Sequence, residues 1–192
     1  MADLSGLPPD LRDVIERAIS QIDNLSVLIE GEFITPDEWQ REMAGIIDQF
    51  HQEAVRVGAD QAAVPILNDT VQRLIDIQLA FLQNFTSDIQ GTDWLPSYNV
   101  RAQMYGSAIK QAYWHGDVIR QTGRVLPLPA MPAEGTQCLS HCKCTWRIET
   151  INAANGHYDA YWERNVKDSC QTCIEREAQW SPVRIRGGEL QL

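Results

Sequence analysis

Through residues 1–123, apolar side chains recur at steps of three and four, the spacing that places them along one face of an α-helix. Glycines follow three of these stretches, at Gly31, Gly58 and Gly91, where a helix can end. Short connections favour antiparallel packing of neighbouring helices. We therefore predict a mainly α-helical chain that begins with an antiparallel bundle. An apolar stripe could instead form an interface between copies of the chain.

Local signals mark where the first two helices begin. Pro8 and Pro9 open the first, which Gly31 should end. Thr35 is followed by Pro36, and Glu38 comes three residues after Thr35. This order is typical of a capping box, in which the threonine and glutamate side chains satisfy free backbone N–H groups. The sequence therefore predicts a second helix from this point to Gly58.

The next two helices are less sharply bounded. A third should end at Gly91, but Pro65 leaves its start open, because proline breaks or kinks a helix. A fourth should begin near Ser97 and end at Gly123, with Gly116 as a weak point inside it.

Charge divides the chain. Residues 1–100 contain 17 Asp and Glu against 5 Lys and Arg, whereas residues 101–192 contain 9 against 11, so the net charge of −10 comes from the first half. Binding to nucleic acid depends on clustered Lys and Arg, which argues against such binding by the first half and leaves it open for the second. A secretory signal and a membrane span are both missing, so we expect synthesis in the cytoplasm.

Residues 124–134 separate two differently built parts. Prolines at 127, 129 and 132 exclude a helix and favour a stiff, extended linker. The segment could also be recognised by an aromatic groove on a partner. We therefore predict an acidic helical domain at 1–123, a proline-rich linker at 124–134 and a cysteine-rich unit at 135–192.

The cysteine-rich unit has the pattern of a small β structure. Residues 145–151 alternate between apolar and polar side chains, residues 157–162 are rich in aromatic side chains, and Asn155-Gly156 is a typical hairpin turn between them. A short helix over 174–179 and an edge strand over 183–185 should follow. A unit of about 50 residues has a limited core and often needs a metal.

Five cysteines supply candidate metal ligands: Cys138, Cys142, Cys144, Cys170 and Cys173. Zinc binds four ligands tetrahedrally, and two cysteine pairs brought together across a hairpin can provide them. We expect Cys170 and Cys173 to form one pair and Cys138 to join Cys142 or Cys144 in the other, with His141 as a possible substitute. Such a zinc site would be structural. The alternatives are buried thiols, disulfides in a mature particle, or a redox pair.

Catalytic patterns are sparse. His51 and His115 lie alone on predicted helices, and nucleotide-binding loops and nucleophile motifs are missing. A metal-dependent nuclease using His157 and Asp159 would need a second, open metal site, which the sequence does not supply. We therefore expect a protein that is not an enzyme.

Two segments resemble a known family. They are Arg101-Ala-Gln-Met-Tyr105 and the stretch from Leu128 to Trp146, which reads LPAMPAEGTQCLSHCKCTW. These residues are similar to minor head proteins of tailed phages, the head-morphogenesis family typified by the F protein of phage Mu. The likeness covers roughly residues 98–186, since the Cys-x-x-Cys pair and Trp180-Ser-Pro182 fit the same C-terminal piece.

The resemblance implies a structural role in a virion assembled in the bacterial cytoplasm. Family members are minor capsid proteins, present in a few copies near the portal, that assist head assembly and the packaging or delivery of DNA. It implies portal and capsid or scaffold proteins as partners, without a membrane. A homo-oligomer and contact with packaged DNA through the basic residues of the C-terminal unit remain open. The alternative is a cytoplasmic zinc-module adaptor or nucleic-acid-binding regulator.

Overall fold

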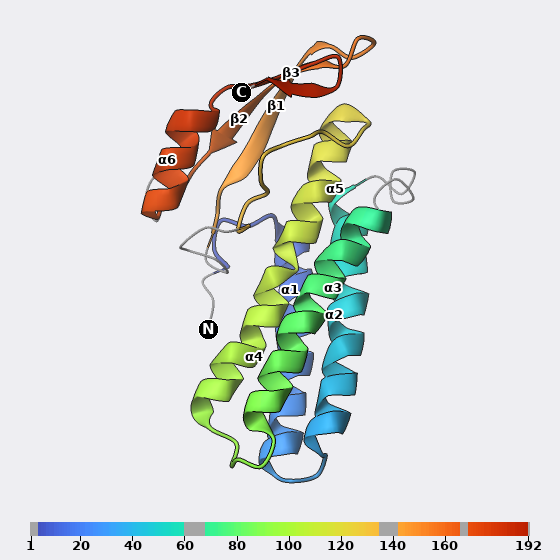
Figure 1. Ribbon diagram of the computed structural model, residues 1–192, viewed down its shortest axis with the longest axis vertical. Coiled ribbons are helices and arrows are strands. Elements are labelled where there is room, and N and C mark those ends of the chain that lie inside the picture. Colours follow the sequence, from blue (N-terminus) through green and yellow to red (C-terminus); the bar gives the residue numbers. More distant parts are fainter. Residues whose placement is uncertain (1–3, 60–67, 135–141, 166–168, 192) are drawn as a thin grey trace.

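The computed structural model describes residues 4–59, 68–134, 142–165 and 169–191. It consists of an elongated helical bundle with a small antiparallel sheet across one end (Figure 1). The predicted fold class is therefore confirmed: a mainly α-helical chain with an antiparallel bundle followed by a small β unit.

The helical part contains five helices: α1 (Pro9–Glu30), α2 (Pro36–Gly58), α3 (Asn68–Ile89), α4 (Pro96–Ala108) and α5 (Lys110–Thr122). The C-terminal part contains β1 (Thr145–Asn152), β2 (His157–Glu163), α6 (Gln171–Trp180), β3 (Val183–Arg186) and β4 (Glu189–Gln191).

The start of α2 confirms the predicted capping box. The Thr35 side chain accepts a hydrogen bond from the backbone N–H of Glu38, and the Glu38 carboxylate accepts one from the backbone N–H of Thr35. These bonds also lower the pKa of Glu38. α1 and α3 likewise occupy the predicted stretches, and their buried residues follow the apolar stripes.

The predicted fourth helix is wrong in one respect, because it is divided into α4 and α5 around Ile109. Ile109 keeps helical dihedral angles, but the N–H of Ala112 bonds to its carbonyl three residues back, so the helix tightens locally. The bend lets α4 pack against α1 while α5 packs against α2 (Figure 1). α5 continues through Gly116 without a break.

Gly116 instead allows α2 and α5 to cross closely. A Cβ atom added at Gly116 would lie 2.7 Å from the Val55 carbonyl oxygen and 2.8 Å from the Ala59 nitrogen. Gly58 lies on the other side of the same crossing, where an added Cβ would clash with the backbone of Tyr113. Neither glycine needs an unusual φ angle, so both are used here for close backbone approach.

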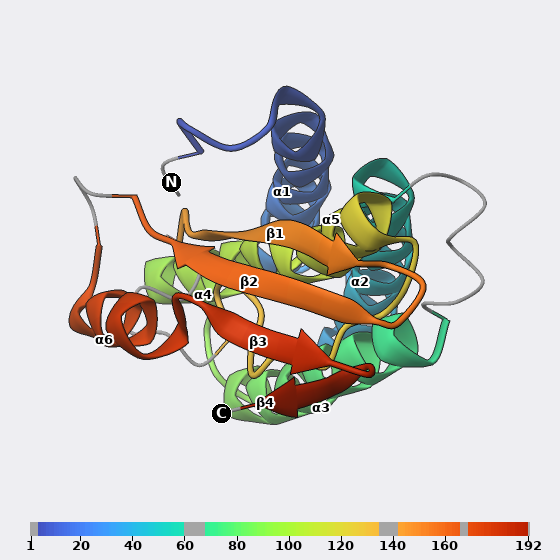
Figure 2. The ribbon, with the colours of Figure 1, turned by 90° about the horizontal axis from the view of Figure 1, so that it is seen from above.

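The C-terminal strands form one antiparallel sheet in the order β1-β2-β3-β4, which lies over the end of the bundle (Figure 2). The predicted hairpin and the strand at 183–185 are confirmed, with Trp146 opposite Trp162 and Tyr158 opposite Ile185. α6 begins three residues earlier than predicted. The last strand, β4, was not predicted, because Gly187 and Gly188 form a turn rather than a tail.

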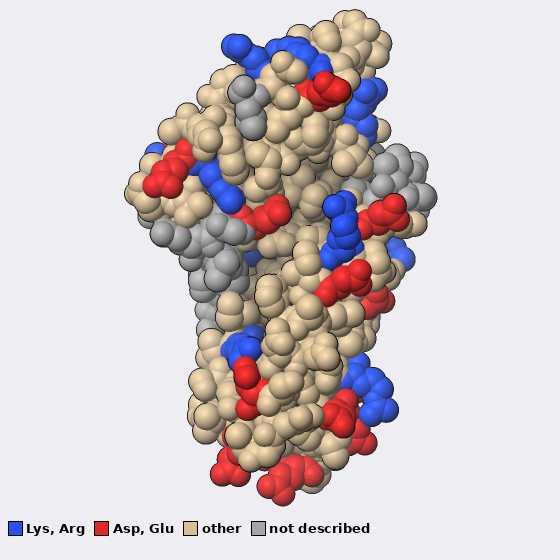
Figure 3. Space-filling model, in the orientation of Figure 1, with Lys and Arg blue, Asp and Glu red and all other residues tan. Residues whose placement is uncertain are grey.

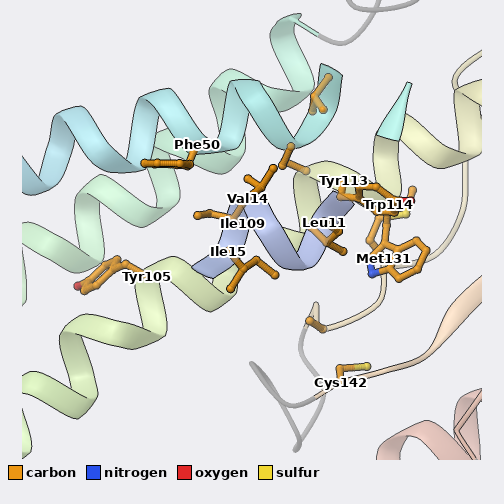
Figure 4. Packing of buried hydrophobic residues seen from close by; sticks show 14 of the residues in the cluster. Leu11, Val14, Ile15, Phe50, Tyr105, Ile109, Tyr113, Trp114, Met131 and Cys142 are labelled. Carbon is orange, nitrogen blue, oxygen red and sulfur yellow. The ribbon is translucent and has the colours of Figure 1, made fainter. Parts of the chain in front are cut away.

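Residues 124–131 contain no helix or strand, residues 132–134 form a turn, and the segment does not form an exposed spacer. Leu126, Met131 and Ala133 are buried, and the Trp146 indole N–H donates to the Ala130 carbonyl at 2.9 Å. Figure 4 shows Met131 and Trp114 together beside the apolar side chains of α1 and α5, with Cys142 close by. One continuous hydrophobic core therefore joins the bundle to the sheet.

Within the described ranges, every helix is too short or too polar to cross a membrane.

Candidate metal centre

Two segments bring cysteines together beside the sheet. Cys142 and Cys144 lie immediately before β1, and Cys170 and Cys173 lie at the start of α6. Cys170 is the residue that caps α6, and the N–H of Cys173 bonds to its carbonyl at 3.0 Å. The C-x-x-C spacing thus becomes one helical turn. The N-terminal end of a helix carries partial positive charge, which favours the thiolate forms that bind metals.

The sulfur atoms lie at distances suited to one tetrahedral ion. The Sγ atoms of Cys142, Cys144 and Cys173 all lie within 4.8 Å of one another. Cys173 Sγ lies 4.0 Å from Cys142 Sγ and 3.5 Å from Cys170 Sγ. A zinc–sulfur bond of about 2.3 Å gives a tetrahedron with sulfur–sulfur edges of about 3.8 Å. The two measured distances fall on either side of that value.

Burial makes this group a closed site. Cys142, Cys144 and Cys173 are buried, Cys170 is partly buried, and all four are free thiols. Hydrogen bonding to Cys142 and burial raise the pKa of Cys144, because crowded sulfur atoms resist becoming charged together. A bound cation would reverse this preference by favouring the thiolates. These residues could therefore hold a metal ion.

The structure brings some of the predicted metal ligands together, and others lie outside the described residues. The Sγ atoms of Cys142, Cys144 and Cys173 form one group, and Cys170 Sγ lies 3.5 Å from Cys173 Sγ but outside that group. Cys138 and His141, which were predicted as a ligand and a substitute, lie outside the described residues.

Lys110 is a site residue that the sequence analysis missed. It is fully buried at the first position of α5, and its Nζ donates a hydrogen bond to the Cys142 carbonyl at 3.0 Å. A buried ammonium group needs compensating partners. The available signal was a lysine at helical spacing from Tyr113 and Trp114, two large side chains on the same helix face. Lys110 fixes the backbone of one candidate ligand to the bundle.

A second polar connection joins the bundle to the sheet through Gln121. Its side-chain amide donates to the Trp146 carbonyl at 3.2 Å and accepts from the Ile148 N–H at 3.1 Å. These two backbone groups lie on the edge strand β1, so the glutamine side chain takes the place of a neighbouring strand. It thereby holds β1, and the cysteines that precede it, against α5.

Three tryptophans pack beside the cysteines on the inner face of the sheet. Trp146, Trp162 and Trp180 lie within 6.2 Å of one another, centroid to centroid. The Arg176 guanidinium stacks over Trp180 at 4.9 Å and over Trp162 at 5.3 Å. These tryptophans provide a spectroscopic probe of the packing in the C-terminal unit.

Among the described residues, the histidines do not assemble into a second metal site. His51 is buried in α2, where its Nδ1 pairs with the Ile47 carbonyl at 2.8 Å. His157 begins β2, and nearby Asp159 forms an ion pair with Arg186 at 2.6 Å. In the described part of the chain, the three cysteines form the one group of three or more His, Cys, Asp or Glu side chains placed to hold a metal.

Comparison with protein-family models, curated proteins and solved structures gave no match to this chain.

Proposed function

We propose that this chain is a structural assembly protein whose C-terminal unit is stabilised by a zinc ion, and that it serves as a minor head protein of a tailed phage. The observation that carries the first part is the convergence of buried thiols from two segments upon one point. The second part rests on the resemblance of residues 98–186 to head-morphogenesis proteins.

Zinc is the metal that best fits these ligands. Four thiolates in a tetrahedral arrangement favour zinc or an iron–sulfur cluster, whereas calcium and magnesium prefer oxygen ligands. The short sulfur–sulfur distances suit a single ion at the centre. Small zinc units are commonly built from two cysteine pairs, as here.

We assign Cys170 as the fourth ligand, with Cys142, Cys144 and Cys173. Cys170 Sγ is already 3.5 Å from Cys173 Sγ, and it lies on the same helical turn. A complete set of four protein ligands leaves no position open for water or substrate, so the zinc ion would be structural. A site of this kind would not itself catalyse a reaction, in keeping with the proposed structural role.

The bundle and the sheet also fit an assembly role better than DNA binding. Three arginines of the C-terminal unit are engaged in ion pairs: Arg147 with Glu163, Arg164 with Glu177 and Arg186 with Asp159. These pairs offer little free positive charge to phosphate. We therefore propose portal and capsid or scaffold proteins as partners, in the virion.

Metal analysis tests the zinc assignment. Protein purified without added metal should contain about one zinc per chain by elemental mass spectrometry. Cys170→Ser should lower this content sharply, whereas Cys138→Ser should not. Loss of zinc in the Cys138 variant alone would show that the fourth ligand is misassigned. A wild-type protein without zinc, whose fold is unchanged by a chelator, would rule out the structural zinc ion.

The phage role is tested separately. Genes for a portal and a terminase should lie beside the gene for this chain, and the chain should be found by mass spectrometry in purified heads. Their absence would favour the alternative, a cytoplasmic zinc-module adaptor or regulator.

A further inference from the structure

The end of the bundle far from the sheet carries a groove with distinctive chemistry. The α1–α2 and α3–α4 connections meet there (Figure 1). The groove has a volume of about 520 Å³. Its walls come from the ends of three helices and from both connections, and its lining includes Ile29, Ile34, Pro36, Ile89, Thr92 and Trp94. We call this region, residues 27–38 and 89–100, the distal tip.

Acidic side chains surround the apolar lining. Glu30, Glu32, Glu38 and Asp93 line the groove, and its lining contains neither Lys nor Arg. Figure 3 shows acidic side chains gathered at this end of the molecule. Carboxylates around a low-dielectric groove concentrate negative potential and attract cations. A partner that fits here must therefore carry positive charge.

Exposed apolar side chains gather at the same end. Phe33 is 76% exposed on the groove rim. Of eleven large apolar residues exposed in the described ranges, five belong to the distal tip: Val27, Leu28, Phe33, Leu95 and Val100. Single exposed apolar residues are ordinary, but a concentration bordered by charged residues marks an interaction site. A free cation alone would leave these side chains in water.

The α1–α2 connection holds Phe33 in place. The Phe33 N–H bonds to the Leu28 carbonyl at 2.9 Å, and the ring lies so close over Gly31 that an added Cβ would come within 2.5 Å of it. Glu32 adopts a left-handed conformation with φ 57°, which a residue with a side chain rarely does. An aromatic anchor fixed before binding loses little entropy when a partner arrives.

We propose that the distal tip is a docking site for a basic segment of a partner protein, with apolar residues that cover Phe33 and enter the groove. The basic side chains pair with the four carboxylates, and the apolar ones account for the exposed side chains. Nucleic acid has the wrong charge for this surface. The site lies at the opposite end of the bundle from the metal centre and does not depend on the proposed zinc ion.

Fluorescence anisotropy with a labelled amphipathic peptide of leucine and lysine, spaced for a helix, tests the proposal on the full chain. We expect this peptide to bind and a leucine–glutamate peptide of equal length not to bind. Phe33→Ala should weaken binding by about tenfold or more, as expected for a central aromatic anchor. Phe81→Ala removes an aromatic ring that is 57% exposed elsewhere on the bundle and should leave binding unchanged.

A pair of charge variants separates specific docking from general attraction. Glu30→Gln/Glu32→Gln removes two charges at the distal tip, whereas Glu16→Gln/Asp76→Asn removes two exposed charges elsewhere. Only the first pair should weaken binding. Equal effects of the two pairs, no effect of Phe33→Ala, or no binding by wild-type protein would overturn the proposal. A wild-type oligomer that Phe33→Ala disperses in sedimentation experiments would also overturn it, by identifying a second copy as the occupant.

Discussion

The bundle buries apolar stripes from five helices against one another, whereas the C-terminal sheet has one packed face and a few large side chains. Trp39, Phe50 and Phe85 in the bundle are fully enclosed by neighbouring helices. In the C-terminal unit the buried side chains are few: Trp146, Tyr158, Ala160, Trp162, Val183 and Ile185, together with the cysteines Cys142, Cys144 and Cys173. A unit this small gains little from apolar burial, so it depends on contacts with its neighbours and on the proposed metal ion.

The two regions nevertheless share a boundary that is both apolar and polar. Met131 and Ala133 continue the core across it, and Lys110 and Gln121 reach from α5 to the backbone around β1. The bundle thus supports the cysteine segments, and three of their sulfur atoms lie close enough together for one ion to join them. The two regions are in contact, but they differ in what stabilises them. Apolar packing stabilises the bundle, whereas the C-terminal unit depends on contacts with its neighbours and on the proposed metal ion.

Removing the metal should have the largest effect. Structural zinc contributes about 10–16 kcal/mol in small zinc-binding peptides, so a chelator should disorder the C-terminal unit. Near-ultraviolet circular dichroism should lose the contribution of Trp146, Trp162 and Trp180 and keep that of Trp39, Trp94 and Trp114 in the bundle, while the far-ultraviolet helical signal largely remains. If both signals are lost together, the bundle does not stay folded without the C-terminal unit, and the two regions do not differ in what stabilises them.

Low pH should lower the stability of the bundle through the buried His51 side chain, independently of the metal. Burial lowers the pKa of His51 from 6.5 to about 4, so the folded protein keeps this histidine neutral. The unfolded chain takes up the proton near pH 6.5, and the folded chain only near pH 4. The free energy of unfolding should therefore be highest above pH 6.5 and fall by up to about 3 kcal/mol as the pH is lowered to 4.

His51→Gln is the matched variant for this measurement, because a glutamine amide can donate to the Ile47 carbonyl but does not titrate. The free energy of unfolding should be measured with denaturant at pH 7 and at pH 4.5. A chelator in both samples removes any effect of protons on metal binding. An unchanged pH dependence in the variant would exclude His51 as the source. His115, whose pKa burial also lowers to about 4, provides a second contribution with the same sign.

Gly116→Ala should destabilise the bundle by about 1–3 kcal/mol, because the added methyl group would collide with the α2 backbone. Gly45→Ala is the matched control: it lies in α2 with open space around it, and it should stabilise the helix by up to about 1 kcal/mol. Thermal denaturation measures both. The zinc content should stay unchanged in each variant, and zinc loss in Gly116→Ala would mean that the two regions are more strongly coupled than we infer.

Lys110→Met should produce the smallest effect. This variant tests the polar contact between the bundle and the segment that carries Cys142. Losing the hydrogen bond to the Cys142 carbonyl should weaken zinc binding by about tenfold, measured by competition with a chromogenic chelator. Met preserves much of the apolar stem, so the thermal stability of the bundle should change less than the zinc affinity. Full zinc affinity in this variant would show that Lys110 does not position the ligand.

The sequence predicted the bundle well because apolar spacing and capping are local signals. The Thr35–Glu38 capping box and the glycine ends of the helices were correctly placed. The bend at Ile109 was not predictable, because it arises from α4 and α5 packing against different helices. The role of Gly116 was also missed, since close approach between α2 and α5 depends on residues far apart in the sequence.

Part of the candidate site was predictable as well. Clustered cysteines identified the residue type, and the C-x-x-C spacing matched one turn of α6. Which cysteines meet depends on how the sheet lies on the bundle, and Lys110 enters from a helix 32 residues away from Cys142. Spacing along the chain therefore indicated metal binding by cysteines, whereas the tertiary fold determined which side chains lie next to one another.

The position of Gln121 also has a consequence for aggregation at high protein concentration. An uncovered edge strand offers its N–H and C=O groups to any other strand, which is a common start of aggregation. On β1, the Trp146 carbonyl and the Ile148 N–H are already bonded to the Gln121 amide. A strand from another molecule would first have to displace this side chain from α5. One glutamine thus protects the part of β1 between Trp146 and Ile148 from unwanted pairing.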